Sequence, residues 1–140
     1  MKIYLIGSLR NEFIPRLGVE LRACGFDVFD DWHGAGPEAD DKWMEYEKLR
    51  GRHYKEALAG EAAQHVFHFD KKHLDLSDAA VLVMPGGKSA HLELGYMAGR
   101  GKSTYVLFDK EPDRYDVMYN FATAVCFNKE ELINELQKIG

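Results

Sequence analysis

A single carboxylate, that of Glu93, stands just beyond the point where the chain is expected to turn from a buried strand into a helix. The run 79–84 is wholly apolar, which is typical of a strand buried on both faces of a parallel sheet. A Pro-Gly-Gly turn follows it, and the pattern predicts a helix from Ser89 to about Gly99. Strand, glycine turn and helix in this order usually build a ligand site from backbone amides. An acid at that place is unusual, because an anion site needs only the amides.

The position of Glu93 in this helix suggests a nucleophile. With Ser89 as the N-cap, Glu93 falls at the fourth helical position, where the helix dipole favours the ionised carboxylate. A capping box would need Glu or Gln at position 92, which is Leu92, so capping does not explain Glu93. An ordinary solvated glutamate remains the alternative, although Leu92 and Leu94 favour a half-buried position. Gly95, inside the helix, suggests close backbone packing.

A carboxylate that attacks a glycosidic bond usually works with a second acid, which protonates the leaving group. Asp70 follows the mostly apolar run 65–69, so we expect it to be partly desolvated and its pKa to be raised. Asp78 stands directly before the strand at 79–84, and closing a turn is its expected role. These positions make Asp70 the stronger candidate for the second acid.

The histidines and aromatic residues offer weaker signals. His65 and His68 have a spacing that can hold zinc, but no HExxH pattern is present and structural histidines are the favoured interpretation. We therefore expect no metal site. Trp32, in a loop rich in glycine and acid residues, is the aromatic residue expected to contact a ligand, whereas core packing accounts for the others.

The elements that must position these residues alternate between strand and helix. Strands are expected at 2–6, 26–29, 79–84, 104–108 and 124–127, and helices at about 14–24, 89–99 and 129–139, with a long loop at 30–41 and a helical segment at 42–70 broken near Gly51 and Gly60. This alternation predicts an α/β fold, a flavodoxin- or Rossmann-like three-layer sandwich with a five-stranded parallel sheet of order 2-1-3-4-5. We expect one domain over 1–140, with a helical, insertion-like region at about 32–60. In this order the loop 7–11 lies beside the turn 86–89 at the crevice where strands one and three diverge.

Composition restricts the classes of function. The chain has 140 residues and a formal net charge of −5, without a cluster of Lys or Arg, so a partner made of nucleic-acid polymer is not expected. No apolar run reaches the length of a membrane span, and the chain starts directly on a strand, so we expect a cytoplasmic protein without membrane contact. The two cysteines suggest neither a disulfide framework nor a zinc knuckle. A small-molecule ligand fits these properties best.

Four ordered landmarks resemble those of a known family. The chain reads Tyr-Leu-Ile-Gly-Ser-Leu-Arg at 4–10, has Asp70 eight residues before Asp78, and continues with Glu-Leu-Gly at 93–95 and Gly-Lys at 101–102. This pattern resembles the nucleoside 2-deoxyribosyltransferase superfamily, which also contains the deoxynucleoside 5′-monophosphate N-glycosidases. The likeness spans most of the chain except the region from 32 to 60.

The resemblance implies an enzyme that needs no cofactor. Glu93 would attack the anomeric carbon of a (deoxy)ribose and form a covalent glycosyl-enzyme, Asp70 would contact or protonate the departing nucleobase, and Tyr4 would orient Glu93. It also implies a homodimer or larger homo-oligomer in which a neighbouring subunit completes the pocket. Met118 and Asn120 would then contact the substrate across the interface.

The resemblance leaves the substrate open between a nucleoside and a nucleotide. The loop and the turn resemble the phosphate cradle of the monophosphate hydrolases; the candidate substrate-binding residues there are Gly7, Ser8, Arg10, Gly86, Gly87, Lys88 and Ser89. Against a phosphate, Gly87 and Asp116 stand where those hydrolases carry serines. We therefore expect transfer of deoxyribose between nucleobases. The alternatives are deoxynucleoside 5′-monophosphate N-hydrolysis and a non-catalytic nucleotide-binding domain.

Overall fold

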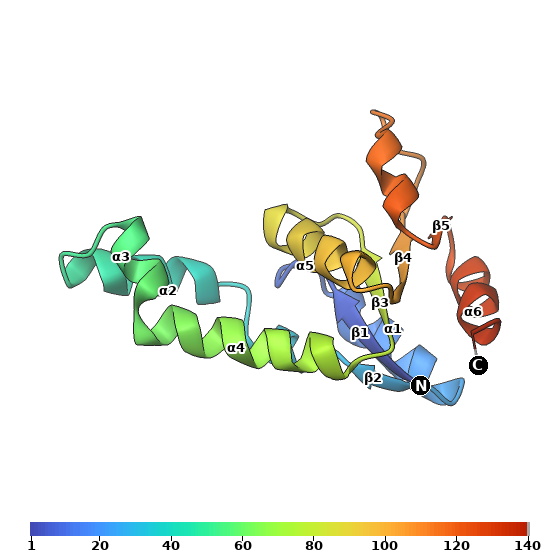
Figure 1. Cartoon of the computed structure of the whole chain (residues 1–140), viewed down its shortest axis with the longest axis horizontal. Helices are drawn as coiled ribbons and strands as arrows, with labels where there is room; N and C mark the ends of the chain where they lie inside the picture. Colours follow the sequence, from blue (N-terminus) through green and yellow to red (C-terminus); the bar gives the residue numbers. More distant parts are fainter. Residues whose placement is uncertain (140) are drawn as a thin grey trace.

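A five-stranded parallel sheet forms the centre of the computed structural model, which describes residues 1–139 (Figure 1). The strands are β1 (Lys2–Ile6), β2 (Asp27–Phe29), β3 (Ala79–Val83), β4 (Ser103–Leu107) and β5 (Ala124–Cys126). They lie in the order β2-β1-β3-β4-β5, and all four pairings are parallel. The predicted fold class and strand order are confirmed. Every residue of β3 is buried, which accounts for its uninterrupted apolar sequence.

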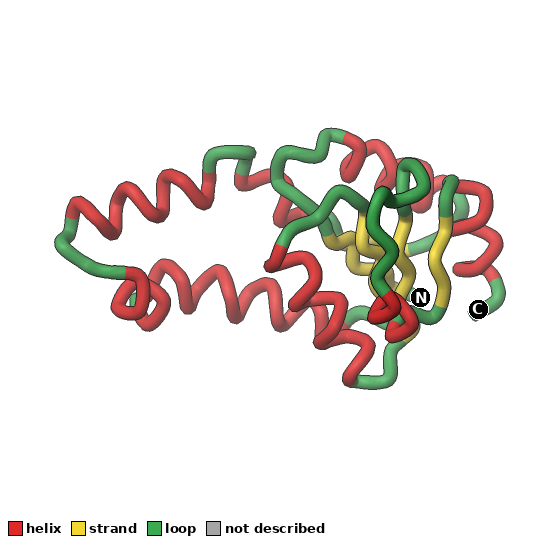
Figure 2. Tube along the Cα trace, turned by 90° about the horizontal axis from the view of Figure 1, so that it is seen from above, coloured by secondary structure: helices red, strands yellow, loops and turns green. Residues whose placement is uncertain are grey.

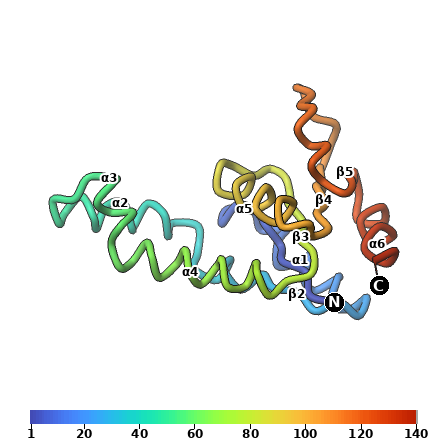
Figure 3. The backbone as a smooth tube through the Cα atoms, in the orientation of Figure 1, coloured from blue at the N-terminus to red at the C-terminus, as the bar shows by residue number. Residues whose placement is uncertain are grey.

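Helices cover both faces of the sheet. On one face, α1 (Phe13–Ala23) and α6 (Lys129–Gln137) bury Leu17, Leu21, Leu132 and Leu136 against alternate strand residues. On the other, α4 (Glu61–Leu76) and α5 (Lys88–Gly99) bury Leu74, Ala90, Leu94 and Met97. The last helix of the described residues, α6, packs beside β5 (Figure 3). These layers form the expected three-layer sandwich.

Between β2 and α4 the chain forms helices that extend away from the sheet (Figure 2). These are a short 3₁₀ helix, η1 (Asp31–Ala35), followed by α2 (Ala39–Leu49) and α3 (Tyr54–Ala59). The prediction of a long loop over 30–41 was wrong, because η1 and the start of α2 occupy it. The predicted breaks are confirmed: Gly51 follows α2 with φ +75°, and Gly60 separates α3 from α4.

Several large apolar side chains of these extended helices are exposed. Leu49 is 85% exposed and Tyr54 71% exposed. The one buried residue of α2 is an acid, Glu47, whose two carboxylate oxygens each lie 3.3 Å from a guanidinium nitrogen, of Arg50 and of Arg52. A buried acid is tolerated there because both of its oxygens are paired. Among residues 1–139, no helix is both long and apolar enough to cross a membrane.

Candidate active site

The three residues predicted to be catalytic come together from three elements. Tyr4 is on β1, Asp70 on α4 and Glu93 on α5. Tyr4 is 1% exposed and its ring lies 5.2 Å from that of Phe29, which fixes the direction of its hydroxyl. That hydroxyl hydrogen-bonds with the Glu93 carboxyl, and the charge of Asp70 acts on both groups. One acid therefore faces a second acid and a phenol in a mostly buried setting.

Glu93 differs from the expectation in its position and in its charge. The helix begins at Lys88 with Gly87 as N-cap and no side-chain cap, so Ser89 is not the N-cap and Glu93 lies beyond the first turn. The helix dipole acts mainly within that first turn. Burial, together with the charge of Asp70, raises the pKa of Glu93 to about 7, although the hydrogen bond with Tyr4 opposes the change. The prediction that the dipole would keep Glu93 ionised was therefore wrong.

One oxygen of Glu93 has no protein partner. Its Oε2 atom is buried and makes no hydrogen bond to any residue in the described part of the chain. Buried polar atoms are almost always paired, so an unpaired carboxylate oxygen requires an explanation. It is free to bond to a ligand that enters beside it.

Asp70 and Tyr4 have shifted pKa values as well. Burial raises the pKa of Asp70 to about 6, as the sequence predicted. Burial and the negative charges of Glu93 and Asp70 raise the pKa of the Tyr4 hydroxyl far above its usual range. Tyr4 therefore stays protonated at neutral pH and donates its hydrogen bond to Glu93.

The loop after β1 lies beside the turn after β3, because Ile6 pairs with Leu82 in the sheet. Ser8 Oγ accepts a hydrogen bond from the Arg10 backbone nitrogen at 3.1 Å, which shapes the loop. Gly7 packs so closely that a Cβ atom there would lie 2.8 Å from Ile14 Cδ1. The loop is thus held tightly at its base.

Arg10 is paired with an acidic residue of α2. Its Nη2 atom donates to Asp41 Oδ2 of α2 at 3.2 Å, and both side chains are exposed. Sequence reasoning missed this contact, because nothing in the sequence relates Asp41 to Arg10 across thirty-one positions. A charged ligand that reached Arg10 would compete with Asp41.

The turn before α5 presents its glycines and cation to solvent. Gly87, Lys88 and Ser89 are all exposed. Gly86 is closer to the sheet, since a Cβ atom there would lie 2.9 Å from Leu82 Cδ1. The free backbone amides of the α5 N-terminus lie at this turn, where an anion can bind.

Trp32 has a structural role, in addition to any contact that it makes with a ligand. Its indole Nε1 donates to the backbone oxygen of Leu5 at 2.7 Å, and its ring packs against the core on both sides of the sheet. The ring is half-buried, so only part of it can contact a ligand.

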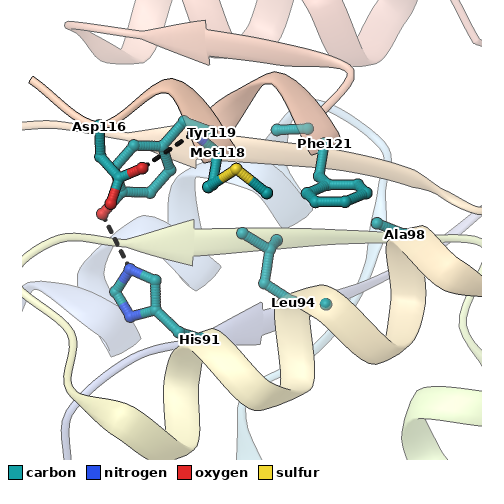
Figure 4. A pocket seen from close by; sticks show the side chains of 9 residues that line it. His91, Leu94, Ala98, Asp116, Met118, Tyr119 and Phe121 are labelled. Atoms are coloured by element: carbon teal, nitrogen blue, oxygen red, sulfur yellow. Dashed lines mark hydrogen bonds between the residues drawn. The ribbon is translucent and has the colours of Figure 1, made fainter.

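Met118 and Asn120 lie on another side of α5 from Glu93. They belong to the 3₁₀ helix η2 (Val117–Phe121), which is capped by Asp116: its Oδ1 accepts from the Met118 backbone nitrogen at 2.8 Å. A groove of about 260 Å³ separates η2 from the face of α5 that carries His91, Leu94 and Ala98 (Figure 4). Glu93 projects from the opposite face of α5, so the structure does not bring Met118 or Asn120 to the Glu93 of the same chain.

The face of α5 along this groove shows two further features. Gly95 is exposed, and a Cβ atom there would meet nothing within 4 Å, so the predicted close packing at Gly95 was wrong. His91 bonds through Nδ1 to the Gly87 carbonyl and through Nε2 to the Tyr119 hydroxyl, both at 2.8 Å. It therefore links the glycine turn to η2, a role that its sequence position did not indicate.

The candidate metal ligands stay apart. Within residues 1–139 no group of three or more His, Cys, Asp or Glu side chains is arranged to hold a metal ion. His68 bonds to Gln64 Oε1 at 3.1 Å on the exposed side of α4.

The electrostatics of the site predict opposite shifts for two substitutions. Asp70→Asn removes a negative charge and should lower the pKa of Glu93, whereas Tyr4→Phe removes a hydrogen bond to the ionised form and should raise it. Each shift is expected to be about one unit, measured by ¹³C NMR titration of the Glu93 carboxyl carbon. Asp116→Asn, which removes an acid beside the opposite face of α5, is the control and should leave the titration unchanged. Shifts of the same sign in the two test variants would contradict this arrangement.

Comparisons with known proteins identify the fold. No family model and no curated protein matches the sequence. A conserved protein from Enterococcus faecalis V583 superposes with a TM-score of 0.68 at 16% identity, over 100% of this chain and 99% of that one.

Two enzymes have similar structures. A 2-deoxyribosyltransferase from Bacillus psychrosaccharolyticus matches with a TM-score of 0.66 at 19% identity, over 96% of this chain and 91% of that one. The CMP N-glycosidase of Clostridium botulinum matches with a TM-score of 0.56 at 14% identity, over 98% of this chain and 99% of that one. Both enzymes belong to the superfamily that the sequence motifs resemble. This chain has the fold of the nucleoside 2-deoxyribosyltransferase superfamily.

Proposed function

We propose that the protein cleaves the N-glycosidic bond of a 2′-deoxynucleoside and transfers the deoxyribosyl group to another nucleobase through a covalent intermediate on Glu93. The observation that carries the proposal is the buried Oε2 atom of Glu93, which has no hydrogen-bond partner in residues 1–139 and lies beside a second acid and a phenol. The 2-deoxyribosyltransferase and the CMP N-glycosidase that share the fold both support chemistry at an N-glycosidic bond.

In the first step, a Glu93 oxygen attacks C1′ of the deoxyribose and forms a C–O ester bond. The C1′–N bond to the nucleobase breaks, and its electron pair goes to the base nitrogen. Asp70, which burial makes a weaker acid than usual, gives a proton to the leaving base. In the second step, a nitrogen of the incoming base attacks C1′, the ester bond breaks, and the proton returns to Asp70. Two displacements retain the configuration at C1′.

The reaction requires one proton shared between the two carboxyls, and near neutral pH they hold about one. With pKa values of about 7 for Glu93 and about 6 for Asp70, the two carboxyls together hold about one proton in this range. The reactive arrangement has the proton on Asp70 and the charge on Glu93. Because the pKa of Glu93 is the higher of the two, this is the minor arrangement of the single proton, and the hydrogen bond from Tyr4 increases its share by stabilising the ionised Glu93.

The surroundings of Arg10 favour a substrate without a 5′-phosphate. Asp41 accepts a hydrogen bond from one guanidinium nitrogen of Arg10, so a phosphate at Arg10 would be repelled by the negative charge of Asp41 beside it. A 5′-monophosphate N-hydrolase is the second candidate. It is supported by the exposed Lys88 and the free amides at the α5 N-terminus, which together suit an anion.

We also propose that the protein assembles as a homodimer or larger homo-oligomer with shared active sites. The η2 segment supports this, because its apolar side chains are exposed: Val117 is 75% exposed, Met118 58% and Phe121 71%. A cluster of exposed apolar side chains often marks a protein–protein interface. Met118 and Asn120 lie away from their own Glu93, so they would reach a substrate only in a neighbouring subunit.

A product assay separates the candidate functions. The protein is incubated with a panel of 2′-deoxynucleosides and their 5′-monophosphates, with and without a second nucleobase, and products are followed by chromatography. We expect exchange of the base on deoxynucleosides and a loss of at least about a thousandfold in rate for Glu93→Ala, because the nucleophile is removed. Free base without exchange would reject the transferase, and substrate binding without turnover would indicate a binding domain.

A second assay tests the pairing of Arg10 with Asp41. Asp41→Asn frees the guanidinium and should raise kcat/KM for deoxynucleoside 5′-monophosphates about two- to fivefold relative to deoxynucleosides, a modest change because the pair is exposed. Glu38→Gln is the matched control: it removes one negative charge next to α2, from an exposed pair with Lys42. Equal selectivity in the two variants would show that Asp41 does not influence phosphate binding.

A further inference from the structure

Lys102 forms hydrogen bonds at the carboxyl ends of both α4 and α5, the helices that carry Asp70 and Glu93. The backbone of Lys102 ends α5: its nitrogen donates to the Met97 oxygen at 3.1 Å, and the Gly101 nitrogen donates to the Ala98 oxygen at 3.0 Å. Gly101 has φ +77°, the left-handed conformation that this type of helix end requires. The Gly-Lys pair thus has a defined role at the end of α5.

The side chain of Lys102 caps the carboxyl end of α4. Its Nζ atom donates to three backbone oxygens at the last turn of that helix, those of Leu74 at 3.2 Å, Asp75 at 2.7 Å and Ser77 at 2.7 Å. An ammonium group has three hydrogens, so all of them are used. A cation at a helix carboxyl end is also favoured by the dipole. Lys102 therefore fixes the end of α4 to the end of α5.

A second contact joins the two helices one turn nearer the site. The Tyr96 hydroxyl of α5 donates to Asp75 Oδ1 of α4, and it accepts from Arg100 Nη1 at 3.2 Å. Asp75 Oδ2 accepts from Lys71 Nζ at 3.0 Å. Two cations lie near the Tyr96 ring, since Lys71 Nζ and Arg100 Cζ are each 5.6 Å from its centroid.

These contacts bear on the acids through the geometry of the helices. Tyr96 comes three residues after Glu93 and shares its side of α5, and Asp75 lies little more than one turn beyond Asp70 on α4. A shift of α4 relative to α5 would therefore change the separation of the two carboxyls. We propose that Lys102, Tyr96 and Asp75 form a clamp that holds α4 against α5 and so sets the position of Asp70 beside Glu93.

The clamp makes Lys102 and Tyr96 positioning residues, a role that rests on the function proposed above. The groups that face Glu93 are Tyr4 from β1 and Asp70 from α4, while β3 carries no titratable residue. His91 and Asp116 lie beside the opposite face of α5. None of the clamp residues shifts the pKa of Glu93 directly, so the clamp acts through the place of Asp70 and the burial that α4 provides.

The test is the Glu93 titration in Lys102→Met and in Tyr96→Phe. Loosening α4 lets water reach Glu93 and moves the charge of Asp70 away, and both changes lower its pKa. We expect the midpoint to fall by about one unit from the wild-type value and the amides of the last two turns of α4 to exchange hydrogen about tenfold faster.

Two matched variants serve as controls. Lys129→Met breaks the 2.8 Å contact of Lys129 with Glu20 on the other face of the sheet, and Tyr115→Phe breaks the 2.6 Å bond of Tyr115 to Glu111. Both should titrate as wild type does.

Folded test variants with a wild-type midpoint and wild-type exchange in α4 would overturn the proposal. If Lys102→Met does not fold, Tyr96→Phe decides, because it removes only one hydroxyl group. The titration needs no substrate. Absence of turnover would therefore refute the proposed function without affecting the test of the clamp.

Discussion

The site depends on the placement of two carboxyl groups in a mostly buried space beside a phenol. Two buried acids cannot both ionise without a large loss of hydration and a mutual repulsion, so they retain protons that water would remove. The raised pKa values of Glu93 and Asp70 mean that the folded protein binds more protons than the unfolded chain does at weakly acid to neutral pH. Stability contributed by these groups is therefore present at low pH and is lost as the pH rises through their folded pKa values. Strongly shifted pKa values of this kind are common in catalytic sites.

The fold supplies the three parts of this arrangement from elements far apart in the sequence. The strand β1, which lies between β2 and β3, carries Tyr4, whose ring packs in the core. The helices α4 and α5 pack on the same face of the sheet and carry Asp70 and Glu93. Because the strands are parallel, the loop with Arg10 and the turn with Gly87 meet at one edge of the sheet. Tyr4 and Glu93 thus come from the same two segments as the groups that we propose to bind an anion, β1 with its loop and the turn with α5.

The sequence predicts the parts of this structure that depend on local patterns. The apolar runs identify the strands, the alternation of strand and helix gives their order, and the landmarks at Tyr4, Asp70 and Glu93 identify the acids that meet. What the sequence did not reveal depends on contacts between distant residues. The pairing of Arg10 with Asp41 and the exposure of Leu49 are examples. The pKa of Glu93 was expected to follow the helix dipole, but burial and Asp70 have the larger effect, and neither can be measured from local spacing.

Mass spectrometry can show directly whether Glu93 forms a covalent intermediate. The protein is mixed with a 2′-deoxynucleoside without an acceptor base, quenched in acid at short times, digested and examined by mass spectrometry. We expect a peptide that contains Glu93 and is heavier by one deoxyribosyl group, and the adduct should disappear when a second nucleobase is added before the quench. Release of the base at the same rate, with no adduct on that peptide at any time, would contradict the claim that Glu93 is the nucleophile.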